Sequence, residues 1–250
     1  MDTKIIAVCN HKGGVAKTTT VASLGSALAS LGYSVLLVDL DAQSNLTSSL
    51  LGYEPQRSTY EALRDREGLP IEKGGTSGVD LAGASLDLAG IELEISTAME
   101  RERILQDVLA EVKDKYQYIL LDCPPSLGLL TLNALTASDT FIVPIQCEYY
   151  ALEGLSQLMS TVRTIKRLYN EYLELEGVLL TMYDGRLNLT QQVVDEVKNF
   201  FPKKVYATVI PRNVRLSEAP SFGLPIIKYD ITSQGAHAYF LLAKEVIESN

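Results

Sequence analysis

The residues best suited to chemistry lie in one short loop near the start of the chain, Lys12-Gly13-Gly14-Val15-Ala16-Lys17-Thr18-Thr19. Its glycines let backbone amides turn toward an anion, Lys17 supplies a positive charge, and Thr18 offers a hydroxyl to Mg2+. An apolar run precedes the loop and an amphipathic segment follows it. A helix that begins there would add unpaired N–H groups and its positive dipole end. The arrangement predicts a site for the phosphates of a nucleotide bound with Mg2+.

The loop departs from the usual phosphate-loop pattern, G-x-x-x-x-G-K-[ST]. Its two glycine positions hold His11 and Ala16, so a deviant form remains, in which Lys12 precedes the glycines. An ordinary glycine-rich turn between a strand and a helix is the alternative. That alternative leaves two lysines and two threonines in register unexplained.

Carboxylates end two further apolar runs, at the places where open α/β sheets bind their ligands. Asp39 and Asp41 follow one run, and Asp122 ends another, with Cys123 and then two prolines after it. We expect Asp41 to position or polarise an attacking water and Asp39 to help hold the loop or the metal shell. Asp122 would reach Mg2+ directly or through water, so the predicted metal set is Thr18, Asp39 and Asp122. An aspartate at a strand end could simply be solvated, but the loop and the two aspartate-bearing runs are three features at successive strand ends, and together they favour a nucleotide site.

The hydrophobic pattern predicts the elements that would position these residues. Short apolar runs alternate with longer amphipathic segments, as in a parallel sheet covered by helices on both faces. The fold class is therefore expected to be α/β, a doubly wound, mostly parallel sheet of the P-loop NTPase type, with surface loops around a strand at 68–90. The candidate strands are residues 5–8, 35–39, 79–82, 118–122, 140–144, 177–182 and 205–210. Two core-facing helix stripes are Val21, Leu24, Leu28 and Leu31, and Ile104, Leu105, Val108, Leu109 and Val112.

Composition narrows the class of protein. The 250 residues are 46% hydrophobic and 21% charged, enough for one large core, so residues 1–250 are expected to form a single domain. The start lacks the basic leader and apolar core of a signal peptide, and a cytoplasmic protein is expected. Cys9, Cys123 and Cys147 each lie at or next to the end of an apolar run, which favours buried reduced thiols over disulfides or a zinc site. A net charge of −9 means that any nucleic-acid role must rest on a local basic patch.

Five blocks of the sequence together resemble the ParA/Soj partition ATPases of the deviant Walker A group. They are residues 12–19, 39–45, 122–126, 146–154 and 211–220. The first three blocks are shared across the wider group, whereas the last two are typical of the chromosome and plasmid partition branch. The similarity spans nearly the whole chain. It implies a nucleoid-associated ATPase that uses ATP and Mg2+ in chromosome or plasmid segregation.

The resemblance also implies a cycle of association. ATP drives a nucleotide sandwich homodimer in which the signature lysine, here Lys12, reaches the partner subunit's phosphates. The implied catalytic residues are Lys12, Lys17 and Asp41, the loop 12–19 holds the nucleotide, and Pro211 and Asn213 touch adenine. The dimer binds double-stranded DNA without sequence preference, and a ParB-type partner stimulates hydrolysis and releases it.

Basic residues that could meet DNA are concentrated late in the chain. The resemblance places a DNA-contacting arginine in the block that holds Arg215, and Lys203 and Lys204 are further candidates. Solvated surface charge explains these two lysines equally well. Residues 198–215 carry a charge of +5 with no Asp or Glu, through Lys198, Lys203, Lys204, Arg212 and Arg215. A second basic face is expected if the segment around Arg163, Lys166 and Arg167 is helical.

The sequence departs from the family pattern at two positions. Ala16 stands where family members usually carry glycine. If that position avoids left-handed dihedrals, alanine should be tolerated with a modest change in phosphate approach. Gln234 stands near a point where a basic residue is common, so one part of the usual DNA surface is expected to be missing. No segment ahead of the first strand could hold a helix-turn-helix domain, and operator-specific repression is not expected.

Three other classes of protein use related loops. A MinD-like ATPase that attaches to membrane and positions division machinery would end in a basic amphipathic helix. Residues 243–250 are acidic instead and should be repelled by anionic lipids, so no membrane partner is expected. A nitrogenase-reductase-like iron-sulfur protein needs cysteines that bridge two subunits, whereas Cys123 and Cys147 are better explained by packing. A small-molecule kinase is disfavoured by the resemblance over the full chain.

Overall fold

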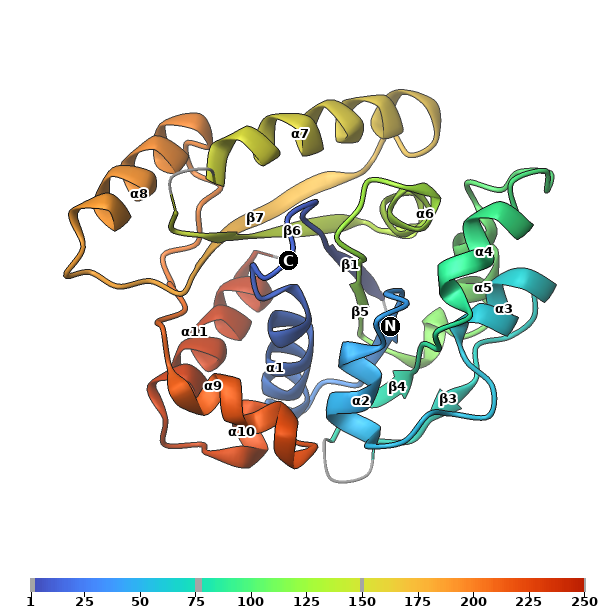
Figure 1. Cartoon of the computed structure of the whole chain (residues 1–250), viewed down its shortest axis with the longest axis horizontal. Coiled ribbons are helices and arrows are strands. Elements are labelled where there is room, and N and C mark those ends of the chain that lie inside the picture. Colours follow the sequence, from blue (N-terminus) through green and yellow to red (C-terminus); the bar gives the residue numbers. More distant parts are fainter. Residues whose placement is uncertain (1–2, 75–77, 149–150, 250) are drawn as a thin grey trace.

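The computed structural model describes residues 3–74, 78–148 and 151–249, with the backbone alone described at 151–154. A seven-stranded sheet crosses the molecule, with helices on both of its faces (Figure 1). The strands are β1 (Lys4–Val8), β2 (Val35–Asp39), β3 (Ile71–Glu72), β4 (Asp80–Ala82), β5 (Tyr118–Asp122), β6 (Thr140–Gln146) and β7 (Glu174–Thr181). The α-helices are α1 (Lys17–Ser30), α2 (Asn45–Leu51), α3 (Thr59–Asp65), α4 (Leu88–Glu94), α5 (Ile104–Ala110), α6 (Leu129–Ala137), α7 (Ala151–Leu168), α8 (Asn188–Phe200), α9 (Val214–Glu218), α10 (Ile226–Tyr229) and α11 (Gln234–Glu248). Short 3-10 helices span Lys113–Lys115 (η1) and Ala219–Phe222 (η2).

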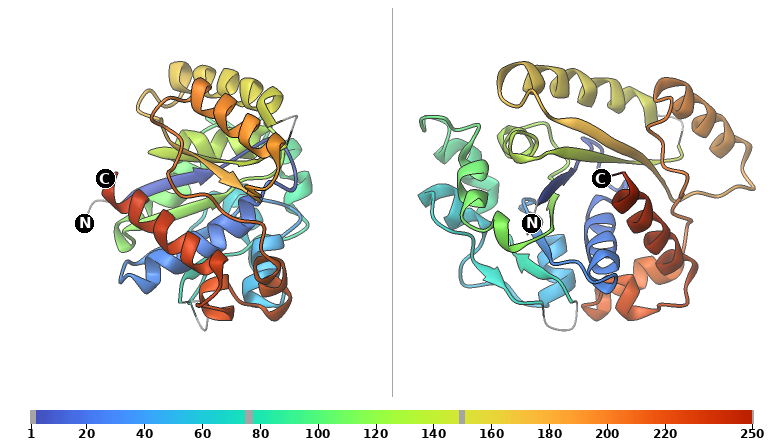
Figure 2. Two further views of the ribbon diagram at one scale, coloured as in Figure 1. Left: turned by 90° about the vertical axis from the view of Figure 1, so that its left-hand side faces the viewer. Right: turned by 180° about the vertical axis from the view of Figure 1, so that it is seen from behind.

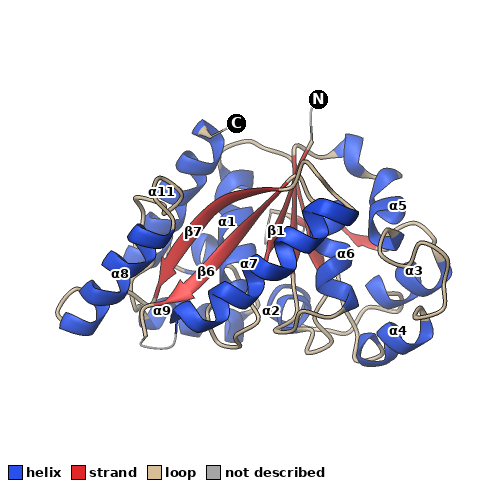
Figure 3. Ribbon diagram, turned by 90° about the horizontal axis from the view of Figure 1, so that it is seen from above, coloured by secondary structure: helices blue, strands red, loops and turns tan. Residues whose placement is uncertain are grey.

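The strand order is β3-β4-β2-β5-β1-β6-β7, and only the β3–β4 pair is antiparallel. Figure 3 shows the strands side by side between the helical layers. The chain leaves β1 and returns to both of its neighbours, β5 and β6, only after long crossovers. This place between neighbours is the switch point where doubly wound sheets bind ligands. The expected α/β fold class is confirmed.

The two faces of the sheet pack against different helices, as the rotated views in Figure 2 show. Helices α3 to α8 cover one face, and α1, α2 and α9 to α11 cover the other. Successive strand residues alternate between the two cores: Ala7 and Cys9 face the first, whereas Ile6 and Val8 face the second. Because both faces are buried, the strands read as continuous apolar runs. Since one sheet passes between both cores, we propose that they fold as a single domain.

The seventh strand is not the one that the sequence predicts. Residues 205–210 run beside β7 and make only isolated bridges, Val178 with Val205 and Tyr183 with Pro211. The amides of Ala207 and Thr208 donate instead to the Glu245 carboxylate of α11, each at 2.8 Å, so they cannot join a strand ladder. The two-residue strand β3, which no hydrophobic run signals, takes the seventh place at the opposite edge.

Most other expectations about the core agree with the structure. Both helix stripes are buried except Leu31, which follows the last residue of α1 and is 40% exposed. The three cysteines are free and buried, as expected. Burial raises the pKa of the Cys9 thiol to about 12 and that of Cys147 to about 11, so both stay protonated near neutral pH. Residues 68–90 contain β3 and β4, one strand more than expected there.

Candidate nucleotide-binding site

Three neighbouring strands end together beneath the site. In the sheet register, Val8 of β1 lies opposite Asp122 of β5, and Asp122 lies opposite Asp39 of β2. The loop 12–19 follows β1 and leads directly into α1, which begins at Lys17. The two aspartates and the loop therefore meet at the carboxyl edge of the sheet, where the alternation of strands and helices predicts a ligand.

The loop itself adopts left-handed backbone at two positions. Gly14 has φ 76°, which glycine adopts without strain. Ala16 has φ 68° and ψ 33°, so the condition under which alanine should be tolerated is not met. Left-handed backbone costs a residue with a Cβ roughly 1–2 kcal/mol. A side chain at Gly13 or Gly14 would enter open space, so nothing obstructs the approach of a ligand to the loop backbone.

Two polar residues that the sequence analysis missed hold the loop against the sheet. Asn10 is buried, and its side chain donates to the Pro144 carbonyl of β6 at 2.8 Å and accepts from the Lys12 amide at 3.1 Å. Thr181, at the end of β7, donates its hydroxyl to the Val15 carbonyl at 3.2 Å. In the sequence, each of these residues is visible only as a polar residue at the end of an apolar run. That pattern does not reveal which partner the side chain reaches.

Lys17 points into the site rather than into solvent. Only 7% of the residue is exposed, and its Nζ donates to the Lys12 carbonyl at 3.1 Å. Burial lowers the pKa of the Lys17 ammonium, an effect opposed by the nearby carboxylates of Asp122 and Asp41. A buried cation that faces carboxylates and open space is suited to bind a polyanion, because the anion replaces the lost hydration.

Asp39 has both carboxylate oxygens engaged within the protein. Oδ1 accepts from the Asp41 amide at 3.1 Å, and Oδ2 accepts from the Thr47 amide and hydroxyl at 2.9 and 2.7 Å. The Thr59 hydroxyl at the start of α3 donates to the Asp39 carbonyl at 2.9 Å. Burial raises the pKa of Asp39 to about 6, although the hydrogen bonds from Thr47 oppose the rise. Of the two roles expected for Asp39, this geometry supports holding the loop that carries Asp41.

Asp41 lies at the wall of the cavity. It is 8% exposed, and its Oδ1 accepts from the Gln43 amide at 3.0 Å. Its carbonyl accepts from the Ser44 amide at 2.8 Å, so a tight turn fixes the direction of the side chain. The carboxylate is thus held at the cavity without being closed off from it.

Asp122 is a buried carboxylate without a hydrogen-bond partner of normal geometry. The residue is 1% exposed, and neither carboxylate oxygen is satisfied among the described residues. Burial raises the pKa of Asp122 well above its usual range, and the Asp39 carboxylate adds to the rise, whereas the Thr18 hydroxyl and Lys17 lower it. An uncompensated buried carboxylate is costly unless a cation joins it. The orphaned oxygens beside Thr18 therefore fit a divalent cation with oxygen ligands.

A cavity of about 430 Å³ opens in front of these groups. Its polar lining includes Lys17, Thr18, Thr19 and Asp41, whereas Asp122 does not line it. Another part of the lining is apolar and suits a flat heterocyclic ring. This apolar part comes from η2, α10 and the residues beside them, which the sequence analysis missed: Leu216, Ala219, Pro220, Leu224, Pro225 and Ile226.

The two residues expected to touch adenine do not line this cavity. Pro211 pairs with Tyr183 and faces a separate groove beside α11. The Asn213 side chain caps α9 by accepting from the Arg215 amide at 2.8 Å. Their assignment to the base stays a prediction.

Lys12 lies at the rim. Its Nζ is 3.4 Å from the Glu148 carboxylate, and the two side chains are 36% and 51% exposed. An exposed pair of this kind contributes little to stability, so Lys12 can exchange this partner for another. Within the block 146–154, Tyr149 and Tyr150 lie outside the described residues.

The expected DNA-contacting residues are spread over separate elements. Arg215 of α9 is ion-paired with Glu218 at 2.9 Å and with Asp230 at 3.4 Å. Lys203 and Lys204 are exposed in the turn after α8. Gln234 is exposed as the first residue of α11.

The expected second basic face does lie on a helix. Arg163, Lys166 and Arg167 belong to α7, where Lys166 pairs with Glu174 at 2.8 Å. Arg163 and Arg167 are exposed. Separately, none of the helices among the described residues has the length and apolar character needed to cross a membrane.

Comparison with known proteins agrees with this geometry. Residues 3–175 match the family model described as an AAA domain. The sporulation initiation inhibitor protein Soj of Bacillus subtilis (strain 168) is 56% identical over 248 residues, which cover 97% of this chain and 98% of that protein. The chromosome partitioning protein ParA of Myxococcus xanthus (strain DK1622) is 48% identical over 253 residues, covering 98% of this chain and 88% of that protein.

A solved structure shares the architecture as well. The crystal structure of cobyrinic acid a,c-diamide synthase from Mycobacterium smegmatis with bound ADP and magnesium superimposes with a TM-score of 0.85 at 39% identity, covering 97% of this chain and 93% of that one. Similarity over 97% or more of this chain reaches well beyond the loop 12–19. This chain therefore belongs to the Soj/ParA family of chromosome-partitioning ATPases.

Proposed function

We propose that this chain is a MgATP-dependent partition ATPase whose nucleotide state controls its association with itself, with DNA and with a ParB-type partner. The observation that carries the proposal is the orphaned, buried Asp122 carboxylate beside Thr18 and Lys17, two residues that line a cavity whose wall is partly polar and partly apolar. Such a site can accept a metal-bound polyphosphate at one end and a purine at the other. The ADP- and magnesium-containing relative supports this choice of ligand.

Named groups of this chain would share the work of binding. The amides of the loop 12–19 and the Lys17 ammonium would hold the phosphates, and Thr18 with Asp122 would hold Mg2+. When bound, Mg2+ supplies positive charge that offsets the phosphate oxygens. Asp39 would act through the turn that it holds, because both of its oxygens already accept hydrogen bonds from the protein.

Asp41 would orient the attacking water for hydrolysis. Its carboxylate is held at the cavity wall by a turn, and it keeps acceptor capacity toward the cavity. A group that acts on the water mainly in the transition state affects turnover more than nucleotide binding. Lys12, at the rim, would reach the phosphates of a second copy in an ATP-dependent homodimer.

The dimer would bind double-stranded DNA without sequence preference and would thus be associated with the nucleoid. Doubling a small basic surface is a means of making binding depend on ATP, because phosphate contacts add along the duplex. A ParB-type partner would then stimulate hydrolysis and release the DNA.

ATP turnover with three additives tests this function. The rate should rise with duplex DNA together with a ParB-like protein, and it should not change with anionic liposomes. Stimulation by liposomes without a response to DNA would instead support a MinD-like ATPase that attaches to membrane. Absence of ATP hydrolysis both with DNA and the ParB-like protein and with liposomes would refute the catalytic part of the proposal.

A further inference from the structure

The outer side of α4 carries an unusual concentration of exposed apolar side chains. Leu88 and Ile91 face the core, whereas Leu86 and Leu93, seven residues apart, share the opposite side of the helical turn and α4. Leu86 is 71% exposed, Leu93 is 82% exposed, and Met99, which follows α4, is 83% exposed. Large hydrophobic side chains exposed this far occur in only two other places among the described residues, at Tyr172 and Val214, far apart in sequence. We call the exposed side of α4 and of the turns that flank it, which carries Leu86, Leu93 and Met99, the α4 face.

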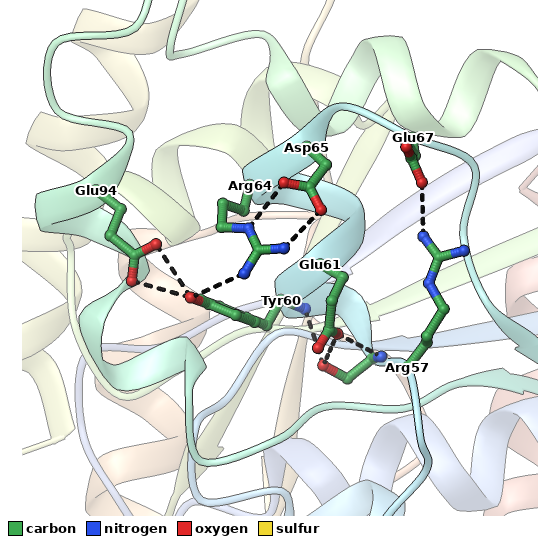
Figure 4. A network of polar contacts seen from close by, with 8 residues as sticks. Arg57, Tyr60, Glu61, Arg64, Asp65, Glu67 and Glu94 are labelled. Carbon is green, nitrogen blue, oxygen red and sulfur yellow. Dashed lines mark hydrogen bonds and ion pairs between the residues drawn. The ribbon is translucent and has the colours of Figure 1, made fainter.

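Polar contacts to neighbouring elements hold the segment that carries the α4 face in place. The Tyr60 hydroxyl of α3 lies 3.2 and 3.0 Å from the two carboxylate oxygens of Glu94, and an Arg64 nitrogen lies 3.5 Å from the same hydroxyl (Figure 4). Glu92 accepts from the Leu130 amide at the start of α6 at 3.0 Å, and Arg66 donates to the Met99 carbonyl. These contacts already order the backbone of the segment. Binding of a ligand there would therefore cost little further conformational entropy.

The net charge around the α4 face is negative, although arginines also lie there. Residues 86–102 contain five carboxylates and one guanidinium and carry a net charge of −4. Residues 64–67, at the end of α3, contact this segment and contain two positive and two negative charges, so they leave the net charge of −4 unchanged. The charged residues of the segment are Asp87, Glu92, Glu94, Arg101, Glu100 and Glu102.

We propose that the α4 face docks a basic amphipathic segment of a second protein. Apolar side chains of that segment would cover Leu86, Leu93 and Met99, and its lysines or arginines would lie against the surrounding carboxylates. The charge decides against other occupants. A two-fold contact between copies of this chain would place two acidic surfaces together, and anionic lipid or nucleic acid would be repelled.

A pair of synthetic helical peptides of about 18 residues tests the docking surface on the full chain. One has leucines on one side and lysines on the other, and the second has glutamates in place of the lysines. The lysine peptide should bind, with an affinity that falls as salt rises, and the glutamate peptide should not. Fluorescence anisotropy measures both. Equal binding of the two peptides, or no binding of the lysine peptide, would overturn the proposal.

Variants locate the site. Leu93→Ser should weaken binding of the lysine peptide about tenfold or more, since a leucine buried on binding would be absent. Leu187→Ser serves as the matched control, because Leu187 is 55% exposed beside α8, on a different part of the surface, and should leave binding unchanged. Both leucines are exposed, so both variants should fold, which circular dichroism verifies. Met99→Ser repeats the test at a second position of the same face.

Hydrogen exchange and sedimentation separate the remaining occupants. The lysine peptide should protect amides within 86–102, and protection confined to another region would refute the α4 face. Binding of anionic vesicles, or self-association of the wild type that Leu93→Ser abolishes, would show that the occupant is a membrane or a second copy. These measurements need no nucleotide, so their outcome is independent of the proposed ATPase cycle.

Discussion

Ala16 holds a left-handed backbone that an alanine rarely adopts, at the position just before the buried Lys17. The conformation places the loop carbonyls and amides correctly for the start of α1, where the Thr20 amide donates to the Ala16 carbonyl at 2.9 Å. Because Ala16 carries a Cβ, this conformation lowers the free energy of unfolding by about 1–2 kcal/mol. A glycine would avoid this strain. Part of the gain would be lost, because glycine has more conformational entropy in the unfolded chain.

We expect Ala16→Gly to raise the free energy of unfolding by up to about 1 kcal/mol, measured by urea denaturation without nucleotide. Ala29→Gly is the matched control, because Ala29 lies in the last turn of α1, where glycine should destabilise the helix by up to about 1 kcal/mol. Destabilisation of similar size by both substitutions would show that Ala16 is not strained.

Asp122 predicts a dependence of stability on pH. Burial, with a further contribution from Asp39, raises the pKa of Asp122, so the folded protein binds this proton more tightly than the unfolded chain does. The contribution of such a group to stability falls as pH rises from the ordinary aspartate range toward the raised pKa. Asp39, with its pKa raised to about 6, acts in the same direction between pH values of about 4 and 6.

Without nucleotide, Asp122→Asn should therefore lose less thermal stability than the wild type as pH rises. The melting midpoint measured at a series of pH values checks this difference. Addition of ADP and Mg2+ should raise the wild-type midpoint more than that of the variant, because the variant lacks the carboxylate proposed to hold Mg2+. Parallel pH curves would show that the buried carboxylate does not carry the expected cost.

At the scale of elements, α11 completes the edge of the sheet beside β7. The Glu245 carboxylate accepts hydrogen bonds from two backbone amides of the segment 205–210, which would otherwise be available to pair with a strand. Tyr206 packs on β7 at Gly177, where even a Cβ would lie 2.5 Å from the ring. A long-range side-chain contact thus replaces a strand ladder at this edge.

Glu245→Ala should lower the free energy of unfolding by about 1–3 kcal/mol, because two backbone amides lose a charged acceptor. The urea midpoint should fall while the slope of the transition stays the same. Glu248→Ala, one turn further along α11 and exposed, is the control and should have little effect. Equal effects of the two variants would assign the stability to the general charge of α11 instead.

At the scale of the whole molecule, the proposed homodimer depends on Lys12, whose ammonium is held only by an exposed ion pair with Glu148. Lys12→Ala should lose ATP-dependent dimerisation more completely than ATP binding, because its ammonium would meet phosphates across the interface. Light scattering with ATP, compared with nucleotide titration, separates the two effects. Lys113→Ala removes an exposed lysine from η1 as a control. A dimer of Lys12→Ala as stable as the wild-type dimer would refute the role across the interface.

DNA binding is a second property of the assembled molecule. Arg215 pairs with Glu218 and Asp230, so a glutamate there would place like charges together and disturb α9. Arg215→Gln is the cleaner substitution. We expect it to weaken duplex DNA binding in the presence of ATP while the dimer still forms. The log-log salt slope should fall by about one unit for each DNA phosphate that the variant no longer neutralises.

Arg186→Gln is the matched control for that measurement, because Arg186 is an exposed arginine paired with Asp184 at 2.6 Å. It should leave DNA affinity unchanged. If Arg215→Gln forms the dimer and binds DNA with the wild-type affinity and salt slope, Arg215 makes no DNA contact.

The sequence by itself determined the fold class and the main positions of the site. Continuous apolar runs that end in Asp39 and Asp122 identify buried parallel strands, because both faces of such a sheet are covered. The glycines and lysines of the loop 12–19 indicate a turn that can surround an anion, since these features are local properties of residue type and spacing.

Only the tertiary structure decided which groups meet. The opposition of Asp39 and Asp122, the bridge from Asn10 to Pro144 and the capture of two amides by Glu245 join residues far apart in sequence. The left-handed backbone at Ala16 and the apolar cavity wall from η2 and α10 likewise depend on packing around the loop. Hydrophobic periodicity reports how deeply a segment is buried, but the partner of a buried polar group is set by the register and packing of distant elements.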